Sequence, residues 1–148
     1  MKIEFYDKDN NVLDDLYDEK AKDIVNTFYE KNNRGMYNSI STRQLRRVYD
    51  EVKHFEALLN QKKMQNWHEL YPLIKMIKAK VTYNTSRVIS KEHWNKNVYQ
   101  SFKDFIVYSI SNIRKDKPED FFVFTKLFEA VYGFYYGICV EKNLKIDK

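Results

Sequence analysis

The chain has 148 residues, of which 43% are hydrophobic and 16% are aromatic, and its formal net charge is +5. This composition is too apolar for a disordered chain, and the length suits one domain with a core of its own. Only three Gly and two Pro residues are present, so many short strands are excluded and a few long helices are favoured. A single cysteine, Cys139, excludes a disulfide framework and a thiolate zinc site. No apolar run approaches the roughly 18 residues of a membrane span, so we expect a cytoplasmic protein that does not associate with membranes.

The charged residues are unevenly distributed along the chain. Residues 1–42 carry six basic and nine acidic side chains, residues 43–91 carry eleven and four, and residues 92–148 carry nine and eight. The positive excess therefore lies in the middle third, and a localised excess is typical of a surface that binds a polyanion. A lysine-rich face in contact with solvent alone explains the charge equally well.

The N-terminal part of the chain predicts one helix. Residues 1–13 have no strong pattern, and we expect them to be loosely ordered. Apolar residues then recur with helical spacing over residues 14–31, and Asn32-Asn33-Arg34-Gly35 predicts the end of this helix.

The second predicted helix has the clearest start signal. Ser41 and Gln44 have the spacing of a capping box, and Ile40 and Leu45 have the spacing of a hydrophobic staple. We therefore expect a helix that begins after Ser41.

Three arginines follow this start. At about 100° per residue, Arg43 and Arg46 lie on the side away from the apolar stripe, with Arg47 just beyond them. Arg43 also falls in the first turn, where backbone N–H groups without helical partners favour an anion. The pattern predicts a phosphate site.

The third helix is predicted over residues 69–84, with Pro72 in its first turn, where proline is tolerated. Its apolar stripe is narrow. Lys78 and Lys80 lie about 80° to either side of the stripe, and Lys75 lies further round. Their long stems can pack on apolar surface while the ammonium groups reach out.

Two more helices complete the chain. The fourth is predicted to begin between Ser90 and Val98, and the fifth to cover residues 116–141. The fifth is apolar almost all round, so we expect it at the centre of the bundle. Its exception is a strip with Gly133 and Gly137, which permits close approach of another backbone, either from a helix of the same chain or from another subunit. The expected fold is an all-α bundle of about five main helices in one domain.

The sequence offers no catalytic or cofactor motif. It lacks a glycine-rich phosphate loop, a nucleophile elbow and a helical zinc motif. His54, His68 and His93 are too scattered to suggest a metal site. We therefore expect no metal, no cofactor and no enzymatic activity.

Two alternatives remain open. The spacing of Arg47 and His54, and of Arg87 and His93, is similar to the arginine–histidine motif of the small helical HEPN ribonucleases, although a valine follows each arginine here in place of the usual polar residue. Alternatively, the chain is an adaptor whose basic face meets an acidic protein.

Three segments resemble, in order and spacing, motifs of the small subunit of type III-A CRISPR effector complexes, the Csm small-subunit family. Residues 40–46 (ISTRQLR) resemble its I-S/T-T-S-x-I-R segment, and residues 77–87 (IKAKVTYNTSR) resemble L-K-V-R-x-x-Y-x-A-G-R. Residues 124–137 (FTKLFEAVYGFYYG) resemble the closing Y-M-E-A-L-V-A-Y-H-x-F-Y-G-G. The chain departs from the family in having Thr85-Ser86 in place of Ala-Gly.

The resemblance implies a non-catalytic helical subunit for antiviral defence. Copies stack along the complex and hold the guide RNA and its paired target RNA by their phosphates, while other subunits carry out cleavage. The positions that match basic residues of the motifs are Arg43, Arg46, Lys78, Lys80 and Arg87. Together with Arg47 and Lys75, which the helical pattern adds, they form the predicted RNA-backbone site.

Overall fold

The start of the second helix follows directly from the sequence. In the computed structural model, which describes residues 2–144 and 146, helix α2 covers Thr42–Gln61. The Ser41 hydroxyl accepts a hydrogen bond from the Gln44 amide at 3.1 Å, and both predicted staple residues are buried. Only this one of the two capping-box hydrogen bonds is made within the helix start. The Ser41 amide donates instead to the Tyr99 hydroxyl of a distant helix at 3.0 Å.

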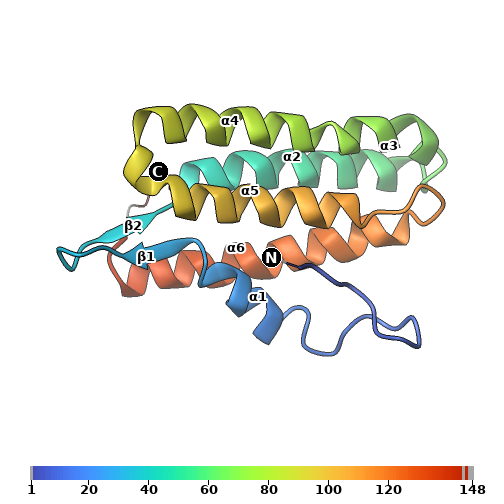
Figure 1. Ribbon diagram of the computed structural model, residues 1–148. Helices are drawn as coiled ribbons and strands as arrows, with labels where there is room; N and C mark the ends of the chain where they lie inside the picture. The colour runs from blue at the N-terminus through green and yellow to red at the C-terminus, as the bar shows by residue number, and fades with distance from the viewer. Residues whose placement is uncertain (1, 145, 147–148) are drawn as a thin grey trace.

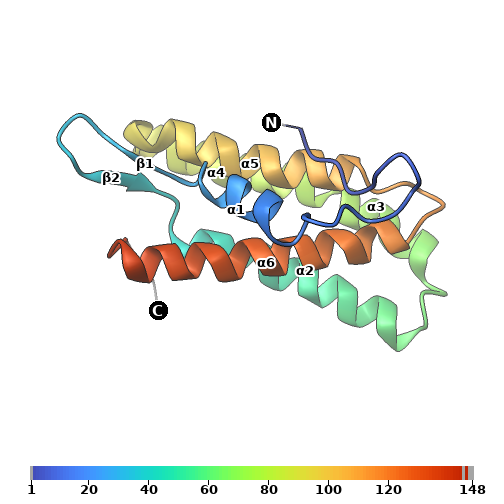
Figure 2. The ribbon, with the colours of Figure 1, turned by 90° about the horizontal axis from the view of Figure 1, so that it is seen from below.

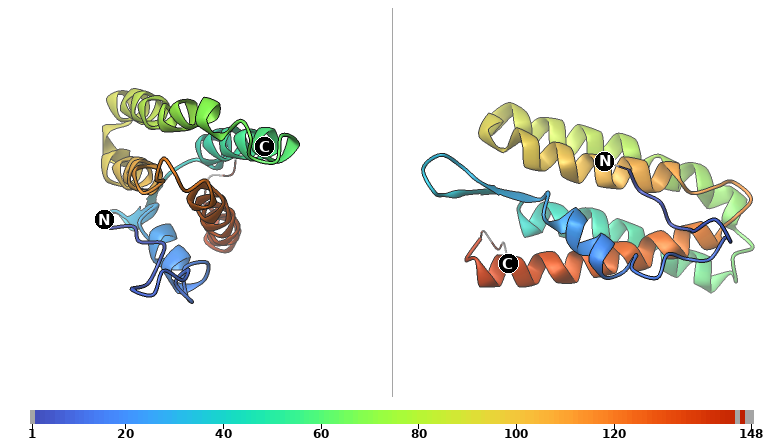
Figure 3. Two further views of the ribbon diagram at one scale, coloured as in Figure 1. Left: turned by 90° about the vertical axis from the view of Figure 1, so that its right-hand side faces the viewer. Right: turned by 60° about the horizontal axis from the view of Figure 1, so that its bottom comes forward.

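The described chain is a helical bundle with one small hairpin (Figure 1). Its elements are α1 (Glu19–Val25), β1 (Tyr29–Lys31), β2 (Tyr37–Ser39), α2, α3 (Trp67–Lys75), α4 (Ile77–Lys91), the 3₁₀ turn η1 (His93–Asn95), α5 (Lys96–Ser111) and α6 (Glu119–Glu141). Helix α4 packs on α5, whereas α1 and α2 both pack on α6. The end-on view shows the helices arranged around one core (Figure 3, left). The prediction of an all-α bundle is confirmed, apart from the two three-residue strands.

Helix α6 is the central helix, as its sequence predicts. Phe121, Phe124, Phe128 and Tyr135 are all fully buried on it. Burial of a large side chain contributes about 1.5–3 kcal/mol, so this one helix supplies much of the apolar stabilisation. It ends at Glu141, as predicted. In the part of the chain that the structure describes, no helix is long and apolar enough to cross a membrane.

The prediction of one helix over residues 14–31 is wrong. Only α1 is helical, and the chain then forms the antiparallel hairpin β1–β2, which projects from one end of the bundle (Figure 2). Local hydrogen bonds close the turn, because the Asn32 side chain accepts from the amides of Arg34 and Met36 at 2.9 and 3.1 Å. Gly35, at φ 76°, supplies the left-handed conformation that the turn requires. Most apolar residues of the predicted stripe are nevertheless buried, namely Leu16, Ala21, Ile24, Val25 and Phe28, whereas Tyr29 is only partly buried.

The N-terminal segment packs against the bundle, where we expected loosely ordered chain over residues 1–13. Tyr6 and Val12 form an isolated antiparallel bridge. Ile3 and Phe5 of this segment are buried. The first residue of the expected segment lies outside the described residues. Short-range periodicity does not reveal such a segment, since its partners are distant in the sequence.

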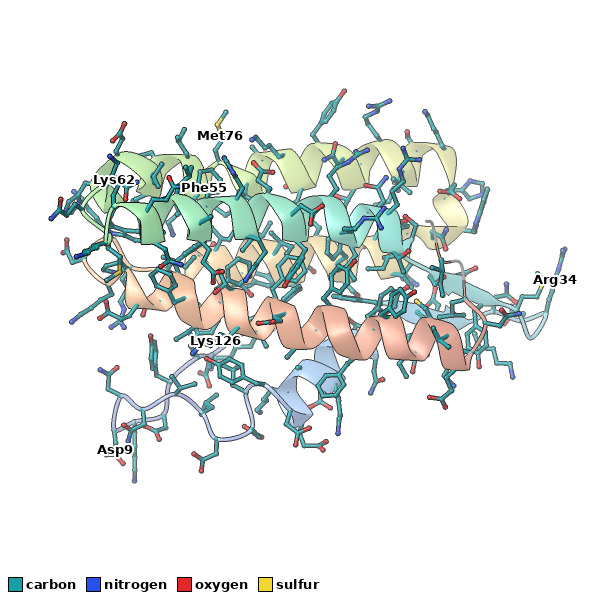
Figure 4. All side chains as sticks on the ribbon, turned by 180° about the vertical axis from the view of Figure 1, so that it is seen from behind. Asp9, Arg34, Phe55, Lys62, Met76 and Lys126 are labelled. Carbon is teal, nitrogen blue, oxygen red and sulfur yellow. The ribbon has the colours of Figure 1, made fainter. Side chains whose placement is uncertain are left out.

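The third predicted helix is two helices. Helix α3 begins earlier than expected, so Pro72 lies in its interior rather than its first turn. A proline there removes one helical hydrogen bond. The helix is interrupted at Met76, whose carbonyl accepts from the Ala79 amide at 3.0 Å with three-residue spacing (Figure 4). Helix α4 then continues to Lys91, well beyond the predicted end at Asn84.

Candidate nucleic-acid interface

A shallow groove runs between α2 and α4. Two adjacent hollows on this face share Arg47 and Asn84 in their walls, and together they define the groove. Figure 4 shows α2 lying between α4 and α6, with the α2–α4 boundary facing the viewer. The charged residues that line the groove are Arg47 and Glu51 of α2, Lys80, Arg87 and Lys91 of α4, and Glu92. Basic side chains outnumber acidic ones there.

Helical spacing explains why these residues share one face. On α4, Arg87 follows Lys80 by two turns, and Lys91 follows Arg87 by about one turn. On α2, Arg47 and Glu51 are one turn apart, so both point toward α4. The groove is thus lined along its whole length by side chains of two amphipathic helices whose apolar sides are buried.

The cations of the groove are not equally available to a ligand. Lys80 forms an ion pair with Glu51 across the groove, with Nζ and Oε1 2.6 Å apart. Arg87 instead places its guanidinium over the Tyr83 ring, 5.7 Å from the centroid. Arg47, Arg87 and Lys91 are exposed.

Neither Arg43 nor Arg46 lines this groove. Arg43 is exposed one turn before Arg47, near the N-terminus of α2. Arg46 is partly buried and lies on the α6 side of α2, in line with Lys53 seven residues later. Lys53 pairs with Glu56 at 2.6 Å, and Glu56 also accepts from the Thr125 hydroxyl of α6 at 2.9 Å.

Lys75 and Lys78 lie on the opposite flank, beside the C-terminal end of α5. The Lys75 ammonium donates to the Ile110 carbonyl at 2.7 Å and lies 5.2 Å from the centroid of the Tyr71 ring. Its burial, with the charge of Lys78, lowers the pKa of Lys75. The Lys78 ammonium is 3.4 Å from the Ser111 hydroxyl. Cations are favourable at a helix C-terminus, so these two lysines stabilise the C-terminal end of α5.

The groove also contains residues that sequence reasoning missed. Lys91 lies one turn beyond Arg87, and the side chains of Gln44 and Asn84 add amide groups. The signal for Lys91 was its four-residue spacing from Arg87. The helix prediction ended at Asn84, which hid that relationship.

The strip with Gly133 and Gly137 faces open space. Both glycines are exposed, and a Cβ atom built on either would meet nothing within 4 Å. The interpretation of the strip as an internal helix crossing is therefore wrong. The contact with another subunit stays a prediction.

The remaining candidate residues are dispersed. His54 is exposed on α2, and His93 lies in the 3₁₀ turn η1. Among residues 2–144 and 146, no group of three His, Cys, Asp or Glu side chains could hold a metal ion. Cys139 is buried, and this burial raises the pKa of its thiol.

The comparison with protein families gives one match. The family model Csm2 Type III-A matches residues 18–136, which include both helices of the groove and most of α6. Neither the comparison with curated proteins nor that with solved structures gives a significant match. The matched range covers most of the chain. The chain therefore belongs to the Csm2 Type III-A family, the small structural subunits of type III-A CRISPR effector complexes.

Proposed function

We propose that the α2–α4 groove binds the phosphate backbone of RNA while the protein acts as a non-catalytic subunit of a cytoplasmic type III-A effector complex. The observation that carries the proposal is the row of Arg47, Lys80, Arg87 and Lys91 along one groove. Family membership supplies the class of partner. The ligands are the guide RNA and the target RNA paired with it, and the protein partners are other subunits, including neighbouring copies of this chain.

The chemistry of the groove suits backbone contacts. Guanidinium and ammonium groups bind phosphate oxygens, and the amides of Gln44 and Asn84 add neutral donors. Phosphate contacts fix the position of a strand but carry no sequence information. In RNA-guided systems the sequence is read by base pairing, so a subunit of this kind needs only a basic groove.

The groove defines a smaller site than the seven predicted positions. Arg43 extends the row of cations toward the start of α2. Arg46 and Lys78 lie on other flanks, where we assign them at most a secondary contact with RNA. Lys75 is omitted from the site, since its ammonium donates to the Ile110 carbonyl at the end of α5.

The test is a triple variant, Arg47→Gln, Arg87→Gln and Lys91→Gln, measured for binding to two unrelated RNAs at several salt concentrations. Each phosphate contact contributes about 0.7 to the slope of log K against log salt for a single strand. The triple variant should lower the slope by about 2, and by the same amount for both RNAs. A change in preference between the two RNAs would contradict backbone binding.

The matched control removes the same charge elsewhere, with Arg34→Gln, Lys115→Gln and Lys126→Gln. Arg34 lies at the hairpin tip and Lys126 on α6, both away from the groove (Figure 4). An equal loss in this control would mean that net charge, not the groove, binds RNA.

Cleavage of RNA that His54→Ala abolishes would support the ribonuclease interpretation instead. RNA binding no stronger and no more dependent on salt than that of a generic polycation would favour the interpretation of the chain as an adaptor for an acidic protein.

A second experiment addresses the complex. The tagged chain, expressed in a host with a type III-A system, should copurify with a large ribonucleoprotein that contains a repeat-derived guide RNA. The triple groove variant should recover the same protein subunits, because the substitutions leave its fold and its protein contacts unchanged. It should recover less RNA with them, because three cations of the groove are removed. Failure of the unaltered chain to recover guide RNA would contradict the proposal.

A further inference from the structure

Tyr83 is the most exposed Phe, Tyr or Trp side chain that the structure describes. It is 62% exposed on α4, whereas most aromatic residues of the chain belong to the core or pack against it. A tyrosine that is this exposed contributes little to burial of apolar surface. Its position therefore calls for an explanation other than packing within the fold.

The ring lies at the wall of the basic groove. It lines the same hollow as Arg47 and Lys80. Along α4 it has Lys80 three residues before it and Arg87 four residues after it, so both cations are neighbours on the helix surface. The Arg87 guanidinium lies over the ring, 5.7 Å from its centroid.

This arrangement combines the two components of single-stranded nucleic-acid sites. Such sites pair a positively charged groove, which follows the backbone, with an aromatic ring on which a base stacks. An arginine beside the ring can contact a phosphate while it remains against the aromatic face. A base within a continuous duplex is stacked and paired, so an exposed ring can stack only on an unpaired or extruded base.

We propose that Tyr83 stacks on an unpaired base of the RNA whose backbone lies in the α2–α4 groove. The inference rests on the proposed function and adds a ligand preference to it. The groove binds RNA with free bases more tightly than a continuous duplex of the same length, and Tyr83 provides the difference. Arg87 acts on both parts of the site, since it contacts the ring and lies in the row of cations.

The test compares dissociation constants for a short polyuridine strand and for an RNA duplex of equal length. Tyr83→Ala should weaken binding of the single strand about 5- to 100-fold, the range for loss of one stacked base, and leave duplex binding within about twofold. Tyr83→Phe should retain the affinity, because the ring is kept. Since the side chain is exposed, Tyr83→Ala should leave the far-ultraviolet circular dichroism and the melting temperature unchanged.

The matched control is Tyr108→Ala, which removes a tyrosine that is 43% exposed on α5, outside the groove. This variant should not alter binding of either RNA. A second readout uses a strand that contains 2-aminopurine. Stacking quenches the fluorescence of this base, so the unaltered chain and Tyr83→Phe should quench it, and Tyr83→Ala should not.

The outcomes separate this inference from the proposed function. If the unaltered chain binds both RNAs through the groove and Tyr83→Ala changes neither, or weakens both equally, the stacking inference is wrong while backbone binding stands. If the triple groove variant binds RNA as well as the unaltered chain does, the proposed function itself is wrong.

Discussion

Lys80 and Glu51 form an ion pair 2.6 Å long that joins α4 to α2 across the groove. The pair reduces the positive charge that the groove presents to a polyanion. It lies near the surface, with the Lys80 side chain 51% exposed and Glu51 27% exposed. Such pairs contribute about 0.2–1 kcal/mol to stability, so the main effect of Glu51 is on the electrostatics of the groove.

Glu51→Gln should therefore raise the affinity for RNA. The substitution releases the Lys80 ammonium and removes a negative charge close to the phosphates. Two unit charges about 4 Å apart in water interact by about 1 kcal/mol. We therefore expect the affinity for RNA to increase about two- to fivefold at low salt, with a steeper salt dependence. Fluorescence anisotropy with a labelled RNA measures both. Glu141→Gln, which makes the same charge change at the end of α6, is the control and should leave the affinity almost unchanged.

The sequence predicted those features of the fold that depend on local patterns. The capping residue Ser41, the staple and the apolar stripes of α2 and α6 located helices and buried residues correctly. The hairpin was missed because its strands have only three residues each, and Phe28 and Tyr29 fit a helical stripe as well as a strand. The break at Met76 was missed because the buried stripe of Leu70, Ile74, Ile77 and Val81 keeps its helical spacing across it.

The candidate site was predictable only in part, for a geometric reason. Helical spacing showed that Lys78 and Lys80 lie on opposite sides of a stripe, but not which neighbouring helix each side faces. The structure places α2 beside Lys80 and α5 beside Lys78. The packing of the helices decides whether a lysine lines the groove or binds the carbonyl end of a neighbouring helix. Spacing within one helix does not reveal that packing.

Lys75 provides the contrast to the groove residues. Lys75→Ala should lower the free energy of unfolding by about 1–2 kcal/mol, because it removes the hydrogen bond to Ile110 and the packing of a half-buried stem. RNA affinity should stay within about twofold of the unaltered chain. Arg87→Ala should show the opposite pattern, with weaker RNA binding and little change in stability. Urea unfolding and RNA titration of the two variants measure the difference, and a large loss of RNA affinity in Lys75→Ala would contradict the assignment.

Asp120 links the N-terminal segment to the start of α6 and the connection that precedes it. Its buried carboxylate accepts from the Tyr6 hydroxyl at 2.7 Å and from two guanidinium nitrogens of Arg114 at 2.8 and 3.0 Å. Burial acts to raise the pKa of Asp120, but the hydrogen bonds from Arg114 and Tyr6 outweigh it and hold the pKa below its ordinary value of 3.8. Burial, together with the hydrogen bond to Asp120, raises the pKa of Tyr6 to about 12.

Asp120→Asn should therefore destabilise the protein in a pH-dependent manner. Loss of hydrogen bonds to a charged group costs about 1.5–3 kcal/mol. Because the pKa is lowered in the folded state, the stability is fully present above the unfolded pKa and is lost as the pH falls through the folded pKa. The difference between Asp120→Asn and the unaltered chain should be constant near neutral pH and shrink below pH 3.8. Urea unfolding over a pH series measures it, and a difference that persists into strong acid would contradict the assignment.

The exposed glycine strip of α6 allows stability and assembly to be separated. Gly133→Ala with Gly137→Ala should stabilise the free chain, since neither methyl group meets an atom within 4 Å and each exchange in a helix is worth about 0.5–1 kcal/mol. If the strip contacts a neighbouring subunit closely, the same methyl groups should lower incorporation into the effector complex. Thermal unfolding measures the first effect, and copurification with the other subunits measures the second, with Gln100→Ala at an exposed position of α5 as control. Lower stability of the free chain would mean that the strip is covered within the fold, whereas higher stability with undiminished incorporation would place the subunit contact elsewhere.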